Sequence, residues 1–270
     1  MNKYTFYKVQ IKIFLIQITL SILLLYCFNN SENYFLVRIK IMKSDFPKCA
    51  AEFLSKLSRN NNREWFENHR EQYKSMFLEP AQEFVMEMGS KLQILRPNIN
   101  AVPKIDKSIF RLHRDVRFSK DKLPYKTNLG ILFWEGDDKK LESSGFYFHI
   151  EPKYFFVGGG TYLFSDNMLK AYREALSDDT ARKQIVSTVK KMKKLGYKIG
   201  GEYFKRLPKG FTEDFPNKEL LFHNGLYCYL EKNSLDELNS RTIVDYCFKH
   251  FKAMLPLHNW LADVLPLFRG

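Results

Sequence analysis

The chain has 270 residues, of which 45% are hydrophobic and 16% are aromatic. This composition is typical of a folded globular protein with an ample core and excludes an intrinsically disordered binding segment. The formal net charge is +13; residues 1–41 hold five Lys or Arg and one Glu, a net of +4, which leaves +9 for the remainder. This excess favours acidic partners such as phosphate, nucleic acid or an anionic membrane surface.

No two of the four cysteines are spaced as a CxxC pair: they are Cys27, Cys49, Cys228 and Cys247. Zinc sites and the disulfide frameworks of small secreted domains both need patterned cysteine spacing. We therefore predict no bound metal and no other cofactor. A reducing compartment follows from the same pattern, and we expect the protein in the cytoplasm.

Residues 1–41 form a hydrophobic leader. Its apolar part, residues 13–28, is short for a membrane span and has no clear cleavage site. Three interpretations stay open: translation begins at Met42, the leader is a signal anchor, or it is a cleaved signal. The start at Met42 is favoured because the composition changes there, just before the first well-capped helix. A single domain is then expected over residues 43–270, and a membrane location only if residues 13–28 are a genuine anchor.

Helical periodicity begins directly after the leader. Asn61 and Glu64 have the spacing of a capping box between a first and a second helix. Pro80 interrupts the second helix, and a third follows. Apolar residues at helical spacing place these helices at residues 46–57, 65–77 and 84–95.

The period then changes to that of β-strands. Apolar and polar residues alternate through Phe110, Leu112 and Phe118, with Arg114 as the one exception. Short connections favour antiparallel neighbours. We predict strands at residues 109–118, 129–134, 145–151 and 154–157. The Gly158–Gly160 run that follows fits no phosphate-binding pattern and is expected to be a turn or bulge.

Helices return in the C-terminal half, with two weaker strands between them. Amphipathic helices are predicted at residues 167–176 and 180–195, strands at 197–204 and 226–230, and a closing helical region at 241–267, interrupted by Pro256. No internal repeat or linker follows the leader. The expected fold class is α+β, a single domain with an antiparallel sheet and helices packed on one side.

The segment from Ser108 to Gly130 concentrates positive charge. It holds six cations, Arg111, Arg114, Arg117, Lys120, Lys122 and Lys126, against Asp115 and Asp121. Arginine presents a planar fork of donors that binds phosphate or carboxylate in a bidentate manner. The segment therefore favours an anion site, although a network of structural ion pairs would produce the same composition. The residues predicted to bind the ligand are Arg111, Arg114, Arg117, Lys122, Tyr125, Lys126, Lys205 and Arg206.

Four segments together resemble a known family. They are NNNREWFENHREQY (60–73), SIFRLHRDVRFSKDKLPYKTNLG (108–130), GFYFHIEP (145–152) and KRLPKGF (205–211). The chain resembles domain-of-unknown-function 2461 over about residues 46–268, and the leader lies outside the match. Eight residues match the family motif: Arg111, Arg114, Asp115, Arg117, Phe118, Asp121, Lys122 and Tyr125. The resemblance implies membership of an uncharacterised family and supplies no mechanism.

A second group of candidates lies on one strand. Tyr147, His149 and Glu151 share a face and could supply a general base, or a metal site together with Asp115 or Asp121. No HExxH spacing is present, and a plain polar sheet face explains the alternation equally well. The candidate catalytic residues are Asp115, Asp121, His149 and Glu151.

Three functions remain open at this point. In the first, the chain is a binding module for anionic ligands, which include nucleic acid. In the second, it is a phosphoryl-transfer or hydrolytic enzyme that uses the same cations. In the third, the basic motif is purely structural. The basic loop at Lys205 and Arg206 could close over an anion held by the motif. An enzyme requires the carboxylates and His149 to converge with the arginines, whereas a binding module requires only a positive surface.

Overall fold

A computed structural model describes residues 46–235, 238 and 242–268. The chain divides into two units, Met1–Lys43 and Ser44–Gly270, and all of the described residues belong to the second. The predicted leader, with its possible anchor at residues 13–28, lies outside the described residues.

Within the described ranges, six antiparallel strands form one sheet in the order β1-β2-β3-β4-β6-β5. The four strands from β1 to β4 are neighbours both in sequence and in space, as expected of a meander. The bounds are Ile99–Asn100 (β1), Leu129–Glu135 (β2), Gly145–Glu151 (β3), Tyr154–Thr161 (β4), Lys198–Glu202 (β5) and His223–Lys232 (β6). The predicted α+β class with an antiparallel sheet is confirmed.

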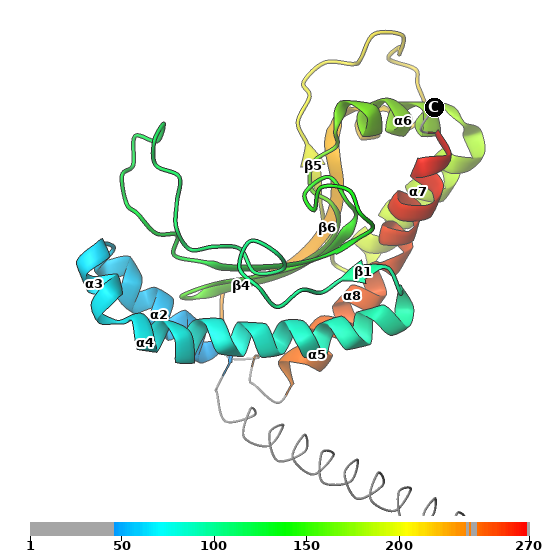
Figure 1. Cartoon of the computed structure of the whole chain (residues 1–270). Coiled ribbons are helices and arrows are strands. Elements are labelled where there is room, and N and C mark those ends of the chain that lie inside the picture. The colour runs from blue at the N-terminus through cyan, green and yellow to red at the C-terminus, as the bar shows by residue number, and fades with distance from the viewer. Residues whose placement is uncertain (1–45, 236–237, 239–241, 269–270) are drawn as a thin grey trace, which may run out of the picture. The chain divides into compact units, whose positions relative to one another are not determined.

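Helices α2, α5 and α8 lie along one face of the sheet, as Figure 1 shows. None of the described helices is long and apolar enough to cross a membrane. The helices are Lys48–Arg59 (α2), Arg63–Asn68 (α3), Arg70–Gln72 (α4), Glu79–Leu95 (α5), Asp166–Ser177 (α6), Asp179–Lys194 (α7) and Ile243–Asn259 (α8), with π-helical turns at Tyr73–Leu78 and Trp260–Val264 and 3-10 turns at Lys218–Phe222 and Leu265–Phe268.

The core lies between this face and the helices, and phenylalanine rings dominate it. Phe146 and Phe148 alternate along β3 and are both fully buried. Phe148 contacts Phe84 of α5 at 4.9 Å between ring centroids, and Phe146 contacts Phe251 of α8 at 5.2 Å. Burial of such rings contributes about 1.5–3 kcal/mol each, so these contacts position the sheet firmly on the helices.

The prediction of a strand over residues 109–118 is wrong. Only isolated bridges form there, and residues 111–126 instead make a projecting loop, called here the basic hairpin, which rises from the sheet face opposite α5 (Figure 1). Asp115 and Asp121 accept hydrogen bonds from the backbone N–H groups of Arg117 and Leu123. Because these local side-chain bonds replace ladder bonds, strand pairing ends near Arg114.

Three further details differ from the predictions. β4 does not end before the Gly158–Gly160 run but continues through it to Thr161, because β3 and β6 pair with these glycines on both sides. The cap of α3 is Asn62, whose side chain accepts from Trp65 N–H at 2.9 Å. Pro256 lies inside α8, which runs on to Asn259.

Candidate functional site

The sheet face opposite α5 and α8, called here the open face, carries aromatic rings separated by glycines. Gly158 on β4 is paired with Tyr147 on β3 and with Tyr229 on β6. Two residues further along β4, Gly160 is paired with Tyr227. These glycines place no side chain over the middle strand, so the open face is hollow between the rings of its neighbours.

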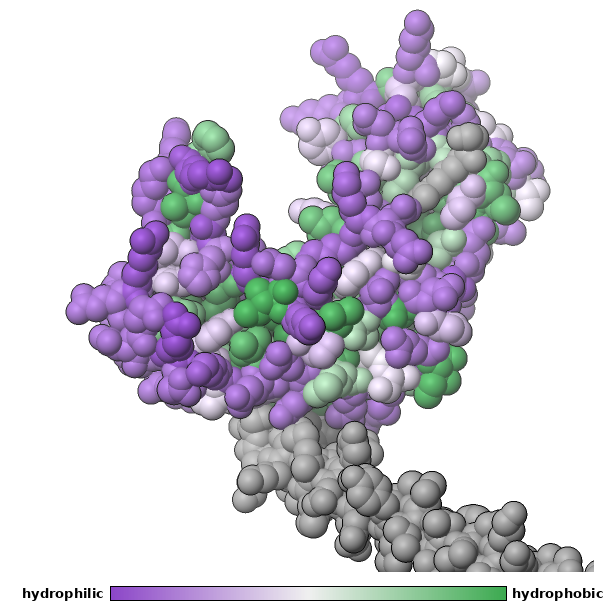
Figure 2. All heavy atoms as spheres, viewed as in Figure 1, coloured by the Kyte–Doolittle hydropathy of each residue, from purple (hydrophilic) through white to green (hydrophobic). Residues whose placement is uncertain are grey.

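A cavity of about 430 Å³ lies on this open face. Its volume falls in the range of small-ligand sites, roughly 300–1,000 Å³. Figure 2 shows the surface hollowed between the basic hairpin and the part of the molecule around β5 and α6. Of the described residues that line the cavity, Lys126 and Lys140 carry positive charge and none is an aspartate or a glutamate. The lining therefore favours an anionic ligand over a cationic one.

Six aromatic side chains form a continuous row, called here the aromatic ladder, along the cavity. Neighbouring ring centroids are separated by 5.4 to 6.2 Å, within the range of favourable ring contacts. In order, the members are Phe110, Tyr147, Phe156, Tyr229, Tyr227 and Tyr162. Five rings are half-buried and Tyr162 is 66% exposed, so ring surface remains open to a ligand.

Two lysines stand at the Phe110 end of the aromatic ladder. The Nζ of Lys140 lies 4.3 Å from the Phe110 ring centroid and that of Lys126 lies 5.9 Å from it. Lys140 Nζ also donates to the backbone carbonyls of Asp106 and Lys107, at 3.0 and 2.8 Å. An ammonium group has three donors, so one N–H of Lys140 is left for a ligand. Burial lowers the pKa of Lys140 from its ordinary value.

Tyr147, His149 and Glu151 form a hydrogen-bonded series along β3, as their shared face predicts. His149 Nδ1 lies 3.2 Å from the Tyr147 hydroxyl, and His149 Nε2 lies 3.1 Å from Glu151 Oε1. The imidazole also stacks on Phe156 at 4.7 Å. Burial lowers the pKa of His149, and the neighbouring carboxylate only partly offsets this, so the ring is neutral near pH 7. His149 lines the cavity and is oriented by two partners.

The motif arginines pair with nearby carboxylates rather than with the cavity. Arg114 Nη1 lies 2.5 Å from Asp121, and Arg117 binds Asp115 through two nitrogens at 2.9 and 2.6 Å. Arg111 lies 3.9 Å from Asp106, a residue outside the motif. These pairs are largely exposed, and the pKa values of Asp115 and Asp121 are lowered by the hydrogen bonds that they accept. The arginines hold the shape of the basic hairpin.

The base of the basic hairpin is fixed to the helical layer through Tyr125. Asn61 Nδ2 donates to the carbonyl of Tyr125 at 2.9 Å, and Asn61 Oδ1 accepts from its N–H at 3.1 Å. The Tyr125 ring is only 2% exposed and stacks on Phe66 at 4.3 Å. The conformation places Lys126, the next residue, at the cavity. Lys122 at the tip donates to the carbonyl of Val116.

The remaining predicted site residues do not meet at the cavity. Lys205 and Arg206 are exposed in the loop after β5, which stands at the opposite end of the sheet from the basic hairpin (Figure 1), and neither pairs with a described residue of the hairpin. Asp115 and Asp121 are engaged at the hairpin tip and make no contact with His149. Within the described ranges, no group of three or more metal-ligating side chains comes together.

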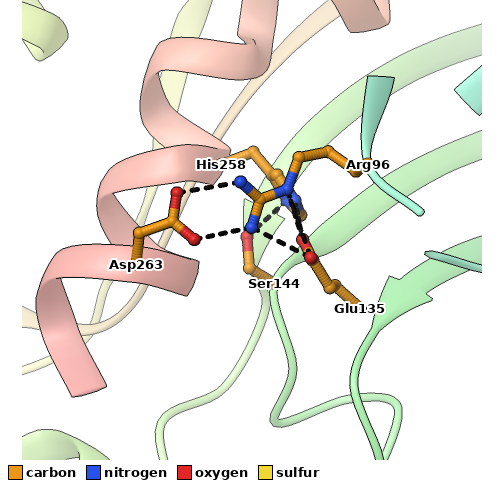
Figure 3. Close-up of polar contacts among 5 residues, drawn as sticks. All are labelled: Arg96, Glu135, Ser144, His258 and Asp263. Carbon is orange, nitrogen blue, oxygen red and sulfur yellow. Dashed lines mark hydrogen bonds and ion pairs between the residues drawn. The ribbon is translucent and has the colours of Figure 1, made fainter. Parts of the chain in front are cut away.

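A buried polar network lies on the other side of the sheet, and sequence reasoning missed it. Figure 3 shows Arg96 between the carboxylates of Glu135 and Asp263. His258 Nε2 lies 2.6 Å from Glu135 Oε2, and Ser144 Oγ lies 2.9 Å from His258 Nδ1. Burial favours the neutral form of Glu135, but hydrogen bonds from His258 and Arg96 outweigh it and lower the pKa of Glu135 to about 2.

The Ser144, His258 and Glu135 series resembles the arrangement of a hydrolase triad, but its location opposes that role. His258 is fully buried and Ser144 is 5% exposed. The neighbours Ser143 and Gly145 line the cavity of the open face, whereas Ser144 faces α8. A nucleophile without access to substrate cannot act, so this network joins β2, β3 and α8 as part of the fold.

The aromatic ladder and the glycines between its rings were also missed. The alternation Phe-Tyr-Phe-His on β3 identified Tyr147 and His149, but Phe156, Tyr227 and Tyr229 come from segments assigned only to strands. A signal was available in the Gly158–Gly160 run, because glycine within a strand often marks close approach of a ligand or another backbone.

The model of the family described as conserved hypothetical protein (DUF2461) matches residues 49–260, which is well over half of the chain. No curated protein matches, and no solved structure matches.

Proposed function

Since the chain belongs to the DUF2461 family of conserved hypothetical proteins, whose description gives no activity, we propose a function from the geometry of the open face. The protein binds an anionic, phosphate-bearing ligand that also contains a flat ring. The ring packs against the aromatic ladder, and the phosphate lies at the Phe110 end, within reach of Lys126 and Lys140.

One observation carries this proposal: the cavity combines an aromatic lining with two cations and, among the described lining residues, no carboxylate. Stacking on aromatic side chains contributes about 1–3 kcal/mol per base-like ring. A charge-assisted hydrogen bond contributes roughly 1.5–3 kcal/mol. A ligand with both features therefore gains more than either fragment alone.

This proposal changes the role of the basic motif. Arg114 and Arg117 already have carboxylate partners, so they support the basic hairpin as one wall of the cavity. The motif contributes to the ligand mainly through Lys126. Arg111 and Lys122 are exposed and add to the positive field around the wall.

Equilibrium titration of the full chain with three probes tests the proposal. The probes are a nucleoside 5′-monophosphate, the same nucleoside without phosphate, and inorganic phosphate. We expect the monophosphate to bind most tightly, and Lys126→Gln and Lys140→Gln each to weaken it by about 1.5–3 kcal/mol. Lys194→Gln, an exposed lysine of α7 outside the cavity, should leave binding unchanged. Equal binding of monophosphate and inorganic phosphate would contradict the role of the rings.

The hydrogen-bonded series at His149 supports a second candidate, an acid–base enzyme acting on the same ligand class. With Nε2–H donating to Glu151, Nδ1 of the neutral imidazole can take the proton of the Tyr147 hydroxyl as that oxygen takes one from water. The hydroxide then attacks phosphorus, the P–O ester bond breaks, and the imidazolium returns the proton through Tyr147 to the departing alkoxide oxygen. Hydrolysis of a nucleotide phosphate ester by the full chain, measured by phosphate release, tests this candidate. His149→Gln should abolish release and preserve binding; absence of release from the unmodified protein leaves the binding function alone.

A further inference from the structure

We propose that the ligand of the open face is a single-stranded nucleic acid that lies across the strands of the sheet. This inference rests on the proposed function and names the substrate class of the same site. It follows from the number of rings in the aromatic ladder, from the solvent-open rim of the cavity at Tyr162 and from the few groups in the cavity that could read a base sequence.

The aromatic ladder is longer than one nucleotide needs. Its rings come from the segment before the basic hairpin, from β3, β4 and β6, and from the residues just after β4. Tyr147 on β3 and Tyr229 on β6 are both paired with Gly158 of β4, so their strands lie two spacings, roughly 9.6 Å, apart. The ladder crosses these three strands and then turns along β6 toward Tyr162. A mononucleotide would cover one or two rings and leave the others in water. A strand with successive bases can use the whole row.

The rim of the cavity at Tyr162 is open to solvent. Tyr162 is 66% exposed, and the next residue, Leu163, donates its N–H to the carbonyl of Leu141, beside Lys140. The exposed loop with Lys205 and Arg206 stands at the other side of the sheet, away from the basic hairpin (Figure 1). The hollow in Figure 2 is thus bordered by a basic segment at either side, as a backbone with a phosphate at every nucleotide requires.

The chemistry of the lining favours single strands of any sequence. Bases in a duplex are stacked on one another and hide the flat faces that the rings would contact. Asn128 and Ser143 are the neutral polar side chains, apart from tyrosine hydroxyls and His149, among the described lining residues. Stacking tolerates every base because each base has a flat face. We therefore infer weak sequence preference.

A length series on the full chain tests the inference. Thymidine monophosphate and oligothymidylates of two, four and eight nucleotides are titrated at low salt, together with an eight-base-pair duplex. We expect affinity to rise about tenfold or more from one to four nucleotides, because each added base that stacks contributes roughly 5- to 150-fold. The duplex should bind more weakly than the octamer. The logarithm of the binding constant should fall with the logarithm of salt by about 0.7 for each phosphate contacted.

The outcomes separate the two proposals. Equal affinity for the monophosphate and the octamer, or equal affinity for duplex and single strand, overturns the polymer inference and leaves the proposed function standing. No binding of any of these probes overturns both. A salt slope that stays the same in Lys126→Gln and Lys140→Gln also overturns the placement of the strand, because each lost phosphate contact should reduce the slope by about 0.7.

Ring substitutions locate the strand on the ladder. Tyr229→Phe keeps a ring and should bind the octamer as the unmodified protein does, whereas Tyr229→Leu should weaken it about 5- to 150-fold. Tyr162→Leu should weaken the octamer by a larger factor than the monophosphate. Ile94→Ala is the control, since Ile94 is 82% exposed on α5, on the opposite side of the sheet from the ladder. Thermal melts confirm folding, and loss of octamer binding in Ile94→Ala alone contradicts the inference.

Discussion

Asn61 shows how one side chain can fix a functional loop. Its amide pairs with both backbone groups of Tyr125 and so acts as a short length of neighbouring strand. The Tyr125 ring then stacks on Phe66 in α3. Two segments of the family match, residues 60–73 and 108–130, meet at this contact, which explains on physical grounds why Tyr125 belongs to a largely charged motif.

We predict that Asn61→Ala destabilises the protein by about 1–2 kcal/mol, because the variant leaves the N–H and carbonyl of Tyr125 without this partner. Urea unfolding measures the change in the free energy of unfolding. Asn68→Ala is the control, since Asn68 is exposed at the end of α3 and its side chain makes no hydrogen bond with a described residue. Equal stability of the two variants would refute the role of Asn61.

Glu135 makes stability depend on pH. Its pKa in the folded protein is about 2, below the ordinary 4.5, because His258 and Arg96 stabilise the carboxylate. A lowered pKa contributes stability above pH 4.5, and that contribution is lost as pH falls from 4.5 toward 2. With allowance for the partial exposure of the group, the loss attributable to Glu135 is about 2 kcal/mol.

Unfolding at pH 7 and at pH 3 tests this linkage. Glu135→Gln should be less stable than the unmodified protein at pH 7, and its stability should fall less between the two pH values. The exposed Glu64→Gln serves as control and should keep the full pH dependence. If Glu135→Gln loses as much stability on acidification as the control does, the carboxylate is not held by this network.

At the scale of elements, the glycine run of β4 shapes both faces of the sheet. Gly159 faces α8, where an added Cβ would lie 3.1 Å from Met254, whereas Gly158 and Gly160 leave the open face hollow. Gly160 also has φ of +130°, a backbone conformation that residues with a side chain rarely adopt. The same three residues thus permit close helix packing and form the cavity.

Gly160→Ala should destabilise the protein by about 3 kcal/mol or more, since the new Cβ would lie 2.3 Å from the carbonyl oxygen of Leu226. Gly210→Ala is the matched control: φ is also positive, at +92°, but nothing lies within 4 Å of an added Cβ. Backbone strain alone should then cost about 1 kcal/mol. Denaturant midpoints compare the two variants, and a Gly210→Ala loss equal to that of Gly160→Ala would mean that the contact with Leu226 is unimportant.

Periodicity was enough to predict most elements. The helices α6 and α7 and the strands β2 and β3 lie within a few residues of their predicted bounds, because each buries one regular face. The strand predicted over residues 109–118 does not form because Asp115 and Asp121 accept hydrogen bonds from local backbone N–H groups. These bonds compete with strand pairing, and the alternation of apolar and polar residues cannot reveal this competition.

The candidate site was less accessible to prediction. Lys126 and His149 were identified and do line the cavity, but Lys140 and the rings of β6 were not. A ladder across strands depends on register, which the sequence of one strand does not contain. Six cations against two carboxylates in the motif suggested that several cations have no acidic partner. In the structure, Arg111 lies beside Asp106, a carboxylate from outside the motif.

At the scale of the whole molecule, the excess of positive charge and the lining of the open face both favour an anionic ligand. The remainder beyond residues 1–41 carries +9, and the cavity lining contributes two cations beside a row of mostly half-buried rings. Long-range attraction of a polyanion toward this face would raise its association rate and would weaken with added salt. The helices cover the opposite face of the sheet and leave the open face as a concave surface for such a ligand.

Crosslinking of a bound strand tests the central claim most directly. An octanucleotide with 5-iododeoxyuridine is bound to the full chain, irradiated, and its attachment sites are mapped by mass spectrometry. The account predicts crosslinks within the aromatic ladder, above all at Phe156, Tyr227 and Tyr229, and their loss on addition of unlabelled octathymidylate. Crosslinks confined to Phe118, which is 96% exposed at the hairpin tip, would contradict it.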